Sequence, residues 1–370
     1  MLLVVIFVMK TNILDLFSGA GGLSLGFRQA GFRVAAAIDN DPNLIITHKK
    51  NFEESISITA DLLKLEPKIF SKEYGIGKND LEGIIGGPPC QGFSLAGPRN
   101  FYDKRNRLYL SFIEYVRFFK PRFFLIENVP GLASLFKGKI KDRIIREFTN
   151  MGYNVNSKVL LASDYGVPQD RRRIFFVGVE DEMFGFPDAT HISIEKGQKR
   201  IVSMESKVTV RDAISDLPLL LNETGAEKMP YTMGPKSEYQ KTMRIGSDKI
   251  YNHVATMHEE QTKRIISLVP QGKNYKSLPK DLQKTRNFHV AWTRLSYDKP
   301  SPTIDTGHRH HFHPEANRVP TVRESARIQS FPDKFIFYGS KTSQYKQVGN
   351  AVPPILAHVI AVDIKKRFGL

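Results

Sequence analysis

The chain has 370 residues, of which 41% are hydrophobic and 25% charged, so it is long enough for a large core and for more than one domain. Its single cysteine, Cys90, excludes an intrachain disulfide, a thiolate-rich zinc site and an iron–sulfur cluster, and fits a reducing compartment such as the cytoplasm. The net charge of +16 favours a polyanionic partner, most simply nucleic acid, although a solvated basic surface is the alternative.

The first ten residues, MLLVVIFVMK, are apolar, but a bilayer span takes about 20 residues. They lack the basic leader and the small-residue cleavage site of a secretory signal. We expect either a strand extension or an upstream start with Met9 as the working one, and we expect no membrane partner.

Short apolar segments then alternate with amphipathic ones up to about residue 185. The apolar segments end at Gly, Asp, Asn or Pro, and short segments of this type predict buried strands. We expect strands at 12–17, 33–38, 83–87, 122–129 and 173–179, and helices at 108–119 and 139–150. This alternation predicts an α/β fold for residues 1–185, with a doubly wound, mostly parallel sheet covered by helices on both faces.

The composition changes after residue 185, where polar stretches rich in Gly, Pro and Lys predict little regular structure. We expect a smaller, loop-rich domain over residues 186–339. Its core would be small and would use Ile265, Ile266, Leu268, Phe288 and Trp292. Residues 340–370 end in an amphipathic helix that we expect to pack back on the first domain.

The stretch DLFSGAGGLSLGF (15–27) runs from a predicted strand through glycines into an amphipathic segment. Glycines admit a ligand close to the backbone, and a helix N-terminus offers unpaired N–H groups. Gly19-Ala20-Gly21 resembles the start of a dinucleotide fingerprint, but Ser24 stands where the third glycine belongs. A nucleotide-like cofactor and a plain tight turn both remain open. Asp39 and Asp61 close two later segments, either as ribose-binding carboxylates or as cap residues.

The stretch IIGGPPCQGFS (84–94) places Cys90 after two prolines, which fix φ at successive positions. Although a lone cysteine is commonly an inert core residue, no core position needs such a turn, so we favour a nucleophile. Glu127 follows directly on the strand RFFLI and can act as an acid if its apolar surroundings raise its pKa; a surface position is the alternative. The run QDRRRIF (169–175) suits phosphate or base edges, or is a solvated charge run.

The ordered set DLFSGAGG, GGPPCQGFS, ENV, QDRRRIF, RESARIQSFPD and QVGNAVPP resembles the cytosine-5 DNA methyltransferases of bacterial restriction–modification systems, over nearly the whole chain. The resemblance implies a Rossmann-like S-adenosylmethionine-dependent methyltransferase fold and methyl transfer to carbon 5 of cytosine in double-stranded DNA. By motif, Cys90 would attack carbon 6 of the ring, Glu127 would contact ring nitrogen 3 and the amino group, and Arg171 and Arg173 would steady the base and Glu127.

The resemblance also implies a cofactor site for S-adenosylmethionine, with S-adenosylhomocysteine as product. The residues it assigns are Phe17, Gly19, Ala20, Gly21, Gly22, Leu23, Asp39, Asp61, Leu62, Pro89, Leu108, Asn350 and Ala351. Asp39 would take the ribose and Asp61 the adenine amino group. Where the family often carries an aromatic that stacks on adenine, this chain has Asn40.

DNA contacts would come from Gln91, Ser94 and Arg99, and from a target recognition region at 186–320 that closes with residues 294–318. We expect no metal, because the cluster His308, His310, His311 and His313 lacks a thiolate or carboxylate pattern. We further expect a monomer that is paired functionally, without a stable complex, with a restriction endonuclease.

Other classes fit less well. A zinc cytidine deaminase needs a second cysteine three residues after the first, where this chain has Phe93. An NAD dehydrogenase would leave the Pro-Pro-Cys and Glu-Asn-Val segments unexplained, and a DNA-binding protein without activity would not need the thiol. An RNA methyltransferase of the same family stays open.

Overall fold

A computed structural model describes residues 11–89, 107–134, 138–193, 204–221, 223–283, 292–307 and 310–370. The chain divides into two compact units. The first comprises the chain up to Leu160 together with Arg172–Pro187 and Ala357–Leu370, and the second comprises Leu161–Arg171 and Asp188–Leu356. Each unit is described separately below.

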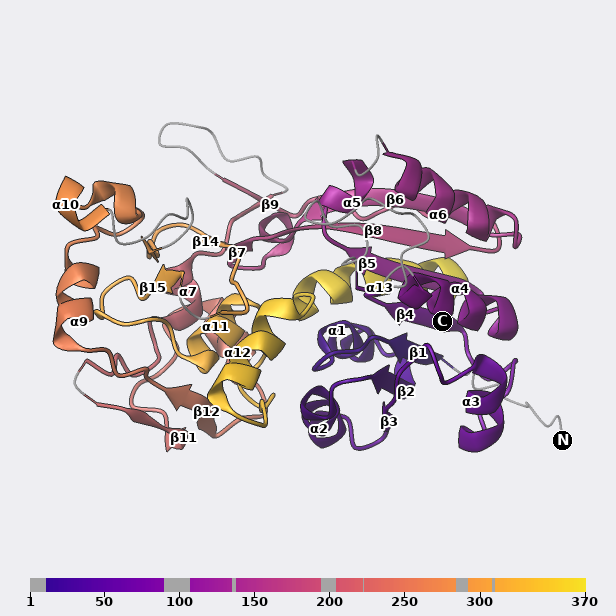
Figure 1. Cartoon of the computed structure of the whole chain (residues 1–370), viewed down its shortest axis with the longest axis horizontal. Helices are drawn as coiled ribbons and strands as arrows, with labels where there is room; N and C mark the ends of the chain where they lie inside the picture. Colours follow the sequence, from indigo (N-terminus) through magenta and orange to yellow (C-terminus); the bar gives the residue numbers. More distant parts are fainter. Residues whose placement is uncertain are drawn as a thin grey trace, which may run out of the picture. The chain divides into compact units, whose positions relative to one another are not determined.

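The first unit alternates strands and helices, as the sequence predicts (Figure 1). Its strands are β1 (Asn12–Leu16), β2 (Arg33–Asp39), β3 (Ile56–Thr59), β4 (Gly83–Gly86), β5 (Phe123–Asn128), β6 (Asn154–Leu161) and β8 (Arg172–Val179). Its helices are α1 (Gly22–Gln29), α2 (Pro42–Asn51), α3 (Pro67–Tyr74), α4 (Arg107–Phe119), α5 (Gly131–Ser134), α6 (Lys139–Thr149) and, from Ala357 onward, α13 (Pro354–Phe368).

These strands form one seven-stranded sheet in the order β3-β2-β1-β4-β5-β8-β6. Strands β1 to β5 are parallel, and β8 is antiparallel to β5. The five predicted strands are confirmed within two residues at each end, and so is the fold class. Strands β3 and β6 were not predicted, because they lie at or near the sheet edges and mix polar with apolar residues instead of forming a continuous apolar run.

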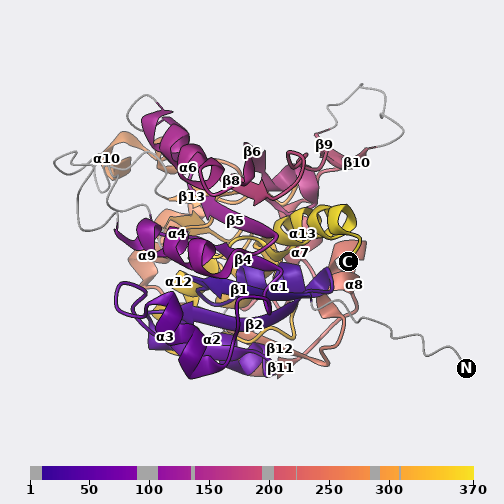
Figure 2. The same ribbon diagram turned by 90° about the vertical axis from the view of Figure 1, so that its right-hand side faces the viewer.

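Side chains on neighbouring positions of β5 point to opposite faces of the sheet, as strand geometry requires. On one face, Phe124 packs against Phe112 of α4 and Phe148 of α6. On the other, the ring of Phe123 stacks against Phe27 of α1 and Phe368 of α13. Figure 2 shows α3, α4 and α6 on one side of the sheet and α13 on the other. Both faces are therefore covered, which leaves the ends of the strands as the place for a site.

The second unit is built from short elements joined by long connections. Its strands are β7 (Gln169–Asp170), β9 (His191–Ile192), β10 (Glu205–Ser206), β11 (Gly225–Pro230), β12 (Lys249–Val254), β13 (Thr293–Arg294), β14 (Ser301–Pro302) and β15 (His311–Phe312). Its helices are η4 (Ala162–Tyr165), α7 (Val210–Ile214), α8 (Glu238–Arg244), α9 (Glu260–Ser267), η5 (Tyr275–Ser277), α10 (Lys280–Gln283), α11 (Val322–Ile328) and α12 (Lys341–Asn350).

A small apolar core in this unit gathers Ile266, Val269, Leu278, Trp292, Phe312 and Val319. Ile266 and Trp292 were predicted core residues and are confirmed, and Ile265 packs against them from the margin. The prediction that Leu268 belongs to this core is wrong. Leu268 follows α9 and is 45% exposed, because α9 contacts the core with Ile266. Phe288 lies outside the described residues.

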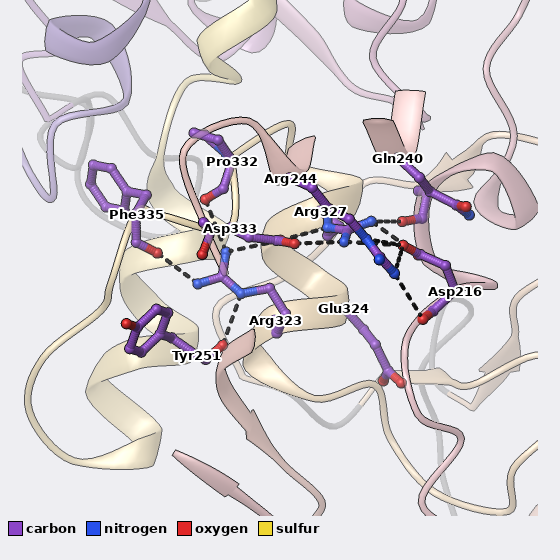
Figure 3. Close-up of polar contacts among 12 residues, drawn as sticks. Asp216, Gln240, Arg244, Tyr251, Arg323, Glu324, Arg327, Pro332, Asp333 and Phe335 are labelled. Atoms are coloured by element: carbon purple, nitrogen blue, oxygen red, sulfur yellow. Dashed lines mark hydrogen bonds and ion pairs between the residues drawn. The ribbon is translucent and has the colours of Figure 1, made fainter. Parts of the chain in front are cut away.

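A buried ionic network organises the segment around α11 (Figure 3). The guanidinium of Arg327 makes two 2.6 Å bonds to the carboxylate of Asp333 and a 3.1 Å bond to Asp216. Arg323 donates to the main-chain carbonyls of Tyr251, Pro332 and Phe335. Because Arg327, Asp333 and Asp216 are fully buried, removing one partner would leave an uncompensated charge inside the unit.

The apolar stretch Lys341–Phe368 passes a length and hydropathy test for a membrane span. However, 61% of its most apolar window is buried inside the protein, as in the core helix of a globular domain.

Candidate active site

The carboxyl ends of β1 to β5 carry most of the residues singled out from the sequence. These strands are parallel neighbours, so the segments that follow them meet at one edge of the sheet. The glycine-rich turn follows β1, Asp39 ends β2, Asp61 comes after β3, and Pro88 and Pro89 follow β4. Strand order reverses between β1 and β4, and such a switch point is where open α/β sheets bind ligands.

The turn after β1 has an unusual backbone. Phe17 has a φ of 60°, a left-handed conformation that costs a residue with a side chain about 1–3 kcal/mol and that clusters at functional sites. Gly19 and Gly21 follow with φ of 57° and 98°. A Cβ on Gly21 would lie 2.6 Å from the ring of Phe52, whereas a Cβ on Gly19 would meet no atom of the described residues within 4 Å. Gly21 therefore allows Phe52 to pack against the turn, and Gly19 borders space that the described residues leave open.

The carboxylate of Asp39 braces this turn from β2. It accepts hydrogen bonds from the backbone N–H of Gly19, at 3.0 Å, and of Asp41, at 3.1 Å. Burial raises the pKa of Asp39 above its ordinary value. Asp61 accepts a hydrogen bond from Leu63 N at 3.0 Å, which is the turn-capping contact that was its alternative interpretation. Asp39 is thus placed beside the glycines, at the edge where a ribose could bind.

Glu127 and Arg173 come together on adjacent strands. Arg173 Nε lies 2.9 Å from Glu127 Oε1, and both side chains are largely buried. Glu127 is directly beside the β4 connection, because a Cβ built on Gly87 would lie 3.1 Å from Glu127 Oε2. The next residue, Asn128, donates from Nδ2 to the carbonyl of Pro88 at 2.9 Å. Strands β5 and β8 therefore position the carboxylate together, and β5 also holds Pro88 in the segment that leads to the cysteine.

Four predicted residues, Cys90, Gln91, Ser94 and Arg99, lie outside the described residues. The described chain stops at Pro89, which is half-buried, and begins again in α4, where Leu108 is also half-buried. The turn residues Ala20, Gly22 and Leu23 are buried, as is Leu62 after Asp61.

Arg171 differs from Arg173 in its surroundings. It belongs to the second unit, where its buried guanidinium donates to the carbonyls of Gly349, at 2.9 Å, and of Ile304, at 3.5 Å. Asn350, the last residue of α12, is exposed, and the carbonyl of Ala351 accepts a hydrogen bond from Gln329 Nε2 at 2.5 Å. Within this unit Arg171 therefore anchors the backbone directly before Asn350.

Two histidines of the cluster, His310 and His313, lie in different environments, and His308 lies outside the described residues. His310 Nδ1 pairs with Asp305 Oδ2 at 2.5 Å, and His313 Nδ1 accepts hydrogen bonds from the backbone N–H of Glu315 and Ala316. Burial lowers the pKa of His313 to about 4. No group of three or more possible metal ligands occurs in the part of the chain that the structure describes.

A buried polar chain beneath the glycine-rich turn was not predicted. Ser24 Oγ lies 2.6 Å from Asp15 Oδ2, and His48 Nε2 lies 3.2 Å from Ser24 Oγ. His48 Nδ1 continues the chain to Ser57 Oγ at 2.8 Å. The sequence held one signal, an aspartate inside the apolar strand NILDL, but its partners come from three other elements.

Comparison with known proteins agrees with this geometry. The family model of C-5 cytosine-specific DNA methylases matches residues 11–366. The chain is 38% identical to the type II methyltransferase M.DdeI of Desulfomicrobium norvegicum, covering 96% of this chain and 89% of that protein. It is 37% identical to the type II methyltransferase M1.HphI of Haemophilus parahaemolyticus, covering 98% and 88%.

Solved structures give the same result. A crystal structure described as a DNA modification methyltransferase encoded within an Escherichia coli prophage superposes with a TM-score of 0.77 at 30% identity, over 97% of this chain and 99% of that one. The Dnmt2 methyltransferase of Schizosaccharomyces pombe shares the fold, with a TM-score of 0.57 at 17% identity over 97% and 99%. The resemblance seen in the sequence is thereby confirmed, and the chain belongs to the C-5 cytosine-specific DNA methylase family as a DNA cytosine-5-methyltransferase of restriction–modification type.

Proposed function

We propose that the enzyme transfers a methyl group from S-adenosylmethionine to carbon 5 of a cytosine within a specific duplex DNA sequence, through a covalent bond between Cys90 and a flipped-out base. The observation that carries this proposal is the anchoring of the segment before Cys90. Gly87 lies against the Glu127 carboxylate and Pro88 is bonded to Asn128. Cys90 itself lies outside the described residues; the segment that ends two residues before it is held beside a carboxylate, and this supports an acid-assisted addition of the thiol to a pyrimidine.

The residues of the turn fit the proposed cofactor. The hydroxyl Oγ of Ser18 is buried and has no hydrogen-bond partner among the described residues, and the space beside Gly19 is open. Helix α1 begins after Gly21 without a side-chain cap, so its first N–H groups can meet a carboxylate. Asp39 would take the ribose hydroxyls and Asp61 the adenine amino group. S-adenosylmethionine, when bound, supplies an electrophilic methyl group on a sulfonium sulfur.

The chain's own residues activate the base. The Cys90 thiolate would add to carbon 6, and the ring electrons thereby shift toward carbon 5, which becomes nucleophilic. Glu127 would hydrogen-bond ring nitrogen 3 and the amino group and so stabilise the charge that builds up there. After carbon 5 has been methylated, loss of its proton and departure of the Cys90 sulfur restore the aromatic ring.

Arg173 is proposed to position Glu127 for this role. Its 2.9 Å bond to Oε1 fixes one carboxylate oxygen, while Oε2 lies on the side of Gly87. A fixed carboxylate matters because a displacement of about 1 Å at a reacting group can cost about a hundredfold in rate. Arg171 would act differently, by holding the backbone before Asn350.

Residues 186–339 are proposed to read the DNA sequence, with Gln91, Ser94 and Arg99 contacting the flipped site. Support comes from the separate compact unit and from the net charge of +16, which suits a phosphate backbone. The reacting atoms of cytosine are buried in a duplex, so the base must leave the stack. We further propose a monomeric cytoplasmic enzyme that protects DNA from a cognate restriction endonuclease without a stable complex.

Methyl transfer from tritiated S-adenosylmethionine to DNA tests the activity, with RNA of the same sequence as the comparison substrate. A duplex that carries 5-fluorocytosine at the target should trap a covalent adduct, and the recovered peptide should contain Cys90. Bisulfite sequencing of DNA from cells that express the protein would give the methylated sequence. Label transfer that survives in Cys90→Ser, or an adduct on another residue, would refute the proposed nucleophile.

A further inference from the structure

A continuous polar chain lies beneath the glycine-rich turn and joins four elements of the first unit. It runs from Asp15 in β1 through Ser24 in α1 and His48 in α2 to Ser57, in β3, with heavy-atom separations of 2.6, 3.2 and 2.8 Å. Asp15, Ser24 and His48 are fully buried. Ser24 stands where a dinucleotide fingerprint carries its third glycine, so this side chain has a use that a glycine could not supply.

The polar chain contacts the glycine-rich turn directly. The ring of His48 stacks on Phe52 with a centroid distance of 4.3 Å, and both rings lie below Gly21, whose Cβ would come within 3.0 Å of His48. Asp15 is two residues before Phe17, the strained first residue of the turn. The network therefore supports the turn from below, while Asp39 holds Gly19 N from β2.

With a neutral imidazole, and with any proton of Asp15 on the oxygen that faces Ser24, the polar chain has two arrangements. If Asp15 is ionised, Ser24 donates to it, so His48 Nε2–H donates to Ser24 and Nδ1 accepts from the Ser57 hydroxyl. If Asp15 carries a proton on Oδ2, it donates to Ser24, Ser24 donates to Nε2, and Nδ1–H donates to Ser57. The second arrangement holds one proton more than the first, and the imidazole is neutral in both. The tautomer of His48 thus reports the protonation state of Asp15.

The electrostatics place this change near neutral pH. The pKa of Asp15 is raised to about 7, mainly by burial; the hydrogen bonds from Ser24 oppose this rise and the nearby Asp39 adds to it. Burial and Arg28 lower the pKa of His48 to about 3, so the ring stays neutral. The other neighbour of β1 in the sheet, β4 (GIIG), brings no titratable side chain. Asp15 Oδ1 has no hydrogen-bond partner among the described residues.

We infer that Asp15, Ser24 and His48 form a proton-linked positioning relay that sets the affinity of the glycine-rich turn for S-adenosylmethionine. This inference rests on the proposed cofactor. In the ionised state, the charged hydrogen bond from Ser24 holds the first turn of α1 in place, and the buried negative charge attracts the cationic sulfonium. On protonation of Asp15 both effects are lost. The product, S-adenosylhomocysteine, has no charge on its sulfur, so only the ordering of α1 by the Ser24 hydrogen bond affects its binding. The relay therefore favours the substrate over the product when Asp15 is ionised.

The histidine tautomer is the decisive readout, since it needs no cofactor. Nitrogen-15 spectra of the full chain, with the His48 signals assigned through His48→Phe, should show Nε2–H at about pH 8 and Nδ1–H at about pH 6. Asp15→Asn should hold one tautomer throughout this range, because its amide does not titrate. Ser24→Ala, which removes only the central hydroxyl, should uncouple the tautomer from pH and covers the case in which Asp15→Asn does not fold.

Calorimetry of both ligands then tests the consequence. The Kd for S-adenosylmethionine should rise about tenfold between about pH 8 and about pH 6, the Kd for S-adenosylhomocysteine should rise less, and both should be nearly flat in Asp15→Asn. A His48 tautomer that does not change with pH in the unsubstituted protein would overturn the relay. So would a pH dependence of binding that persists in Asp15→Asn. If the tautomer switches but neither ligand binds at any pH, the proposed cofactor fails and the role assigned to the relay fails with it.

Discussion

The glycine-rich turn offers two substitutions that add the same methyl group and should fail for different reasons. Gly19 and Gly21 have φ of 57° and 98°, so alanine at either position costs about 1–2 kcal/mol in backbone strain. At position 21 the new Cβ would also lie 2.6 Å from Phe52, which is fully buried and stacked on His48. Overpacking of this kind adds about 1–3 kcal/mol.

Gly21→Ala should therefore destabilise β1, α1 and α2 by about 2–5 kcal/mol, and Gly19→Ala by only about 1–2 kcal/mol. Cofactor binding should also weaken in Gly19→Ala, because a Cβ at this position meets no atom of the described residues within 4 Å and would occupy the space proposed for the ligand. We expect its Kd for S-adenosylmethionine to rise tenfold or more, since about 1.4 kcal/mol of overlap has this effect.

Amide hydrogen exchange on β1, α1 and α2 measures the local stability without assuming that both units unfold together, and calorimetry measures the Kd. Two results would refute this reasoning. One is equal loss of protection in the two variants, which would mean that Phe52 moves aside without cost. The other is normal cofactor affinity in Gly19→Ala, which would place the ligand elsewhere.

Three further predictions follow from the ion pairs and the buried histidine. Arg173→Ala should lower the single-turnover methylation rate about tenfold to a hundredfold with little change in cofactor Kd, because Glu127 loses its 2.9 Å partner; an unchanged rate would contradict the positioning role. Arg327→Met should destabilise the second unit by about 3–5 kcal/mol, measured by urea unfolding with the fluorescence of the single tryptophan. The control Lys241→Met removes an exposed ion pair and should cost less than about 1 kcal/mol. Similar losses of stability in the two variants would argue against the buried network. The pKa of His313 is lowered to about 4, so the unfolded chain takes up the proton first as the pH falls from about 6.5. The free energy of unfolding of the second unit should therefore decrease by up to about 3 kcal/mol by about pH 4. His313→Gln should reduce this dependence of stability on pH.

Elements with a strong local pattern were predicted well. Helix α4 was expected at 108–119 and occupies Arg107–Phe119, because apolar residues at helical spacing leave one face to pack on the sheet. The edge strand β3 was missed because its side chains are half polar. The antiparallel direction of β8 could not be predicted either, because an apolar run such as RIFFVGV forms a buried strand equally well whether it runs parallel or antiparallel to its neighbour.

The residues of the candidate site also include some whose surroundings the sequence could not predict. Arg171 and Arg173 are two residues apart in one basic run, and nothing in that run distinguishes them. In the structure Arg173 pairs with Glu127, while Arg171 binds main-chain carbonyls at Ile304 and Gly349. Sequence reasoning assigned both of them to the same task.

The sequence by itself determined the alternating α/β architecture and the family, because both depend on short motifs and on apolar periodicity that are complete within a few neighbouring residues. Only the tertiary structure decided which side chains meet. The bond from Asn128 to Pro88 and the relay from Asp15 to Ser57 each join residues far apart in the chain. Such partners depend on strand order and helix packing, which bring distant segments together at spacings that no local pattern encodes.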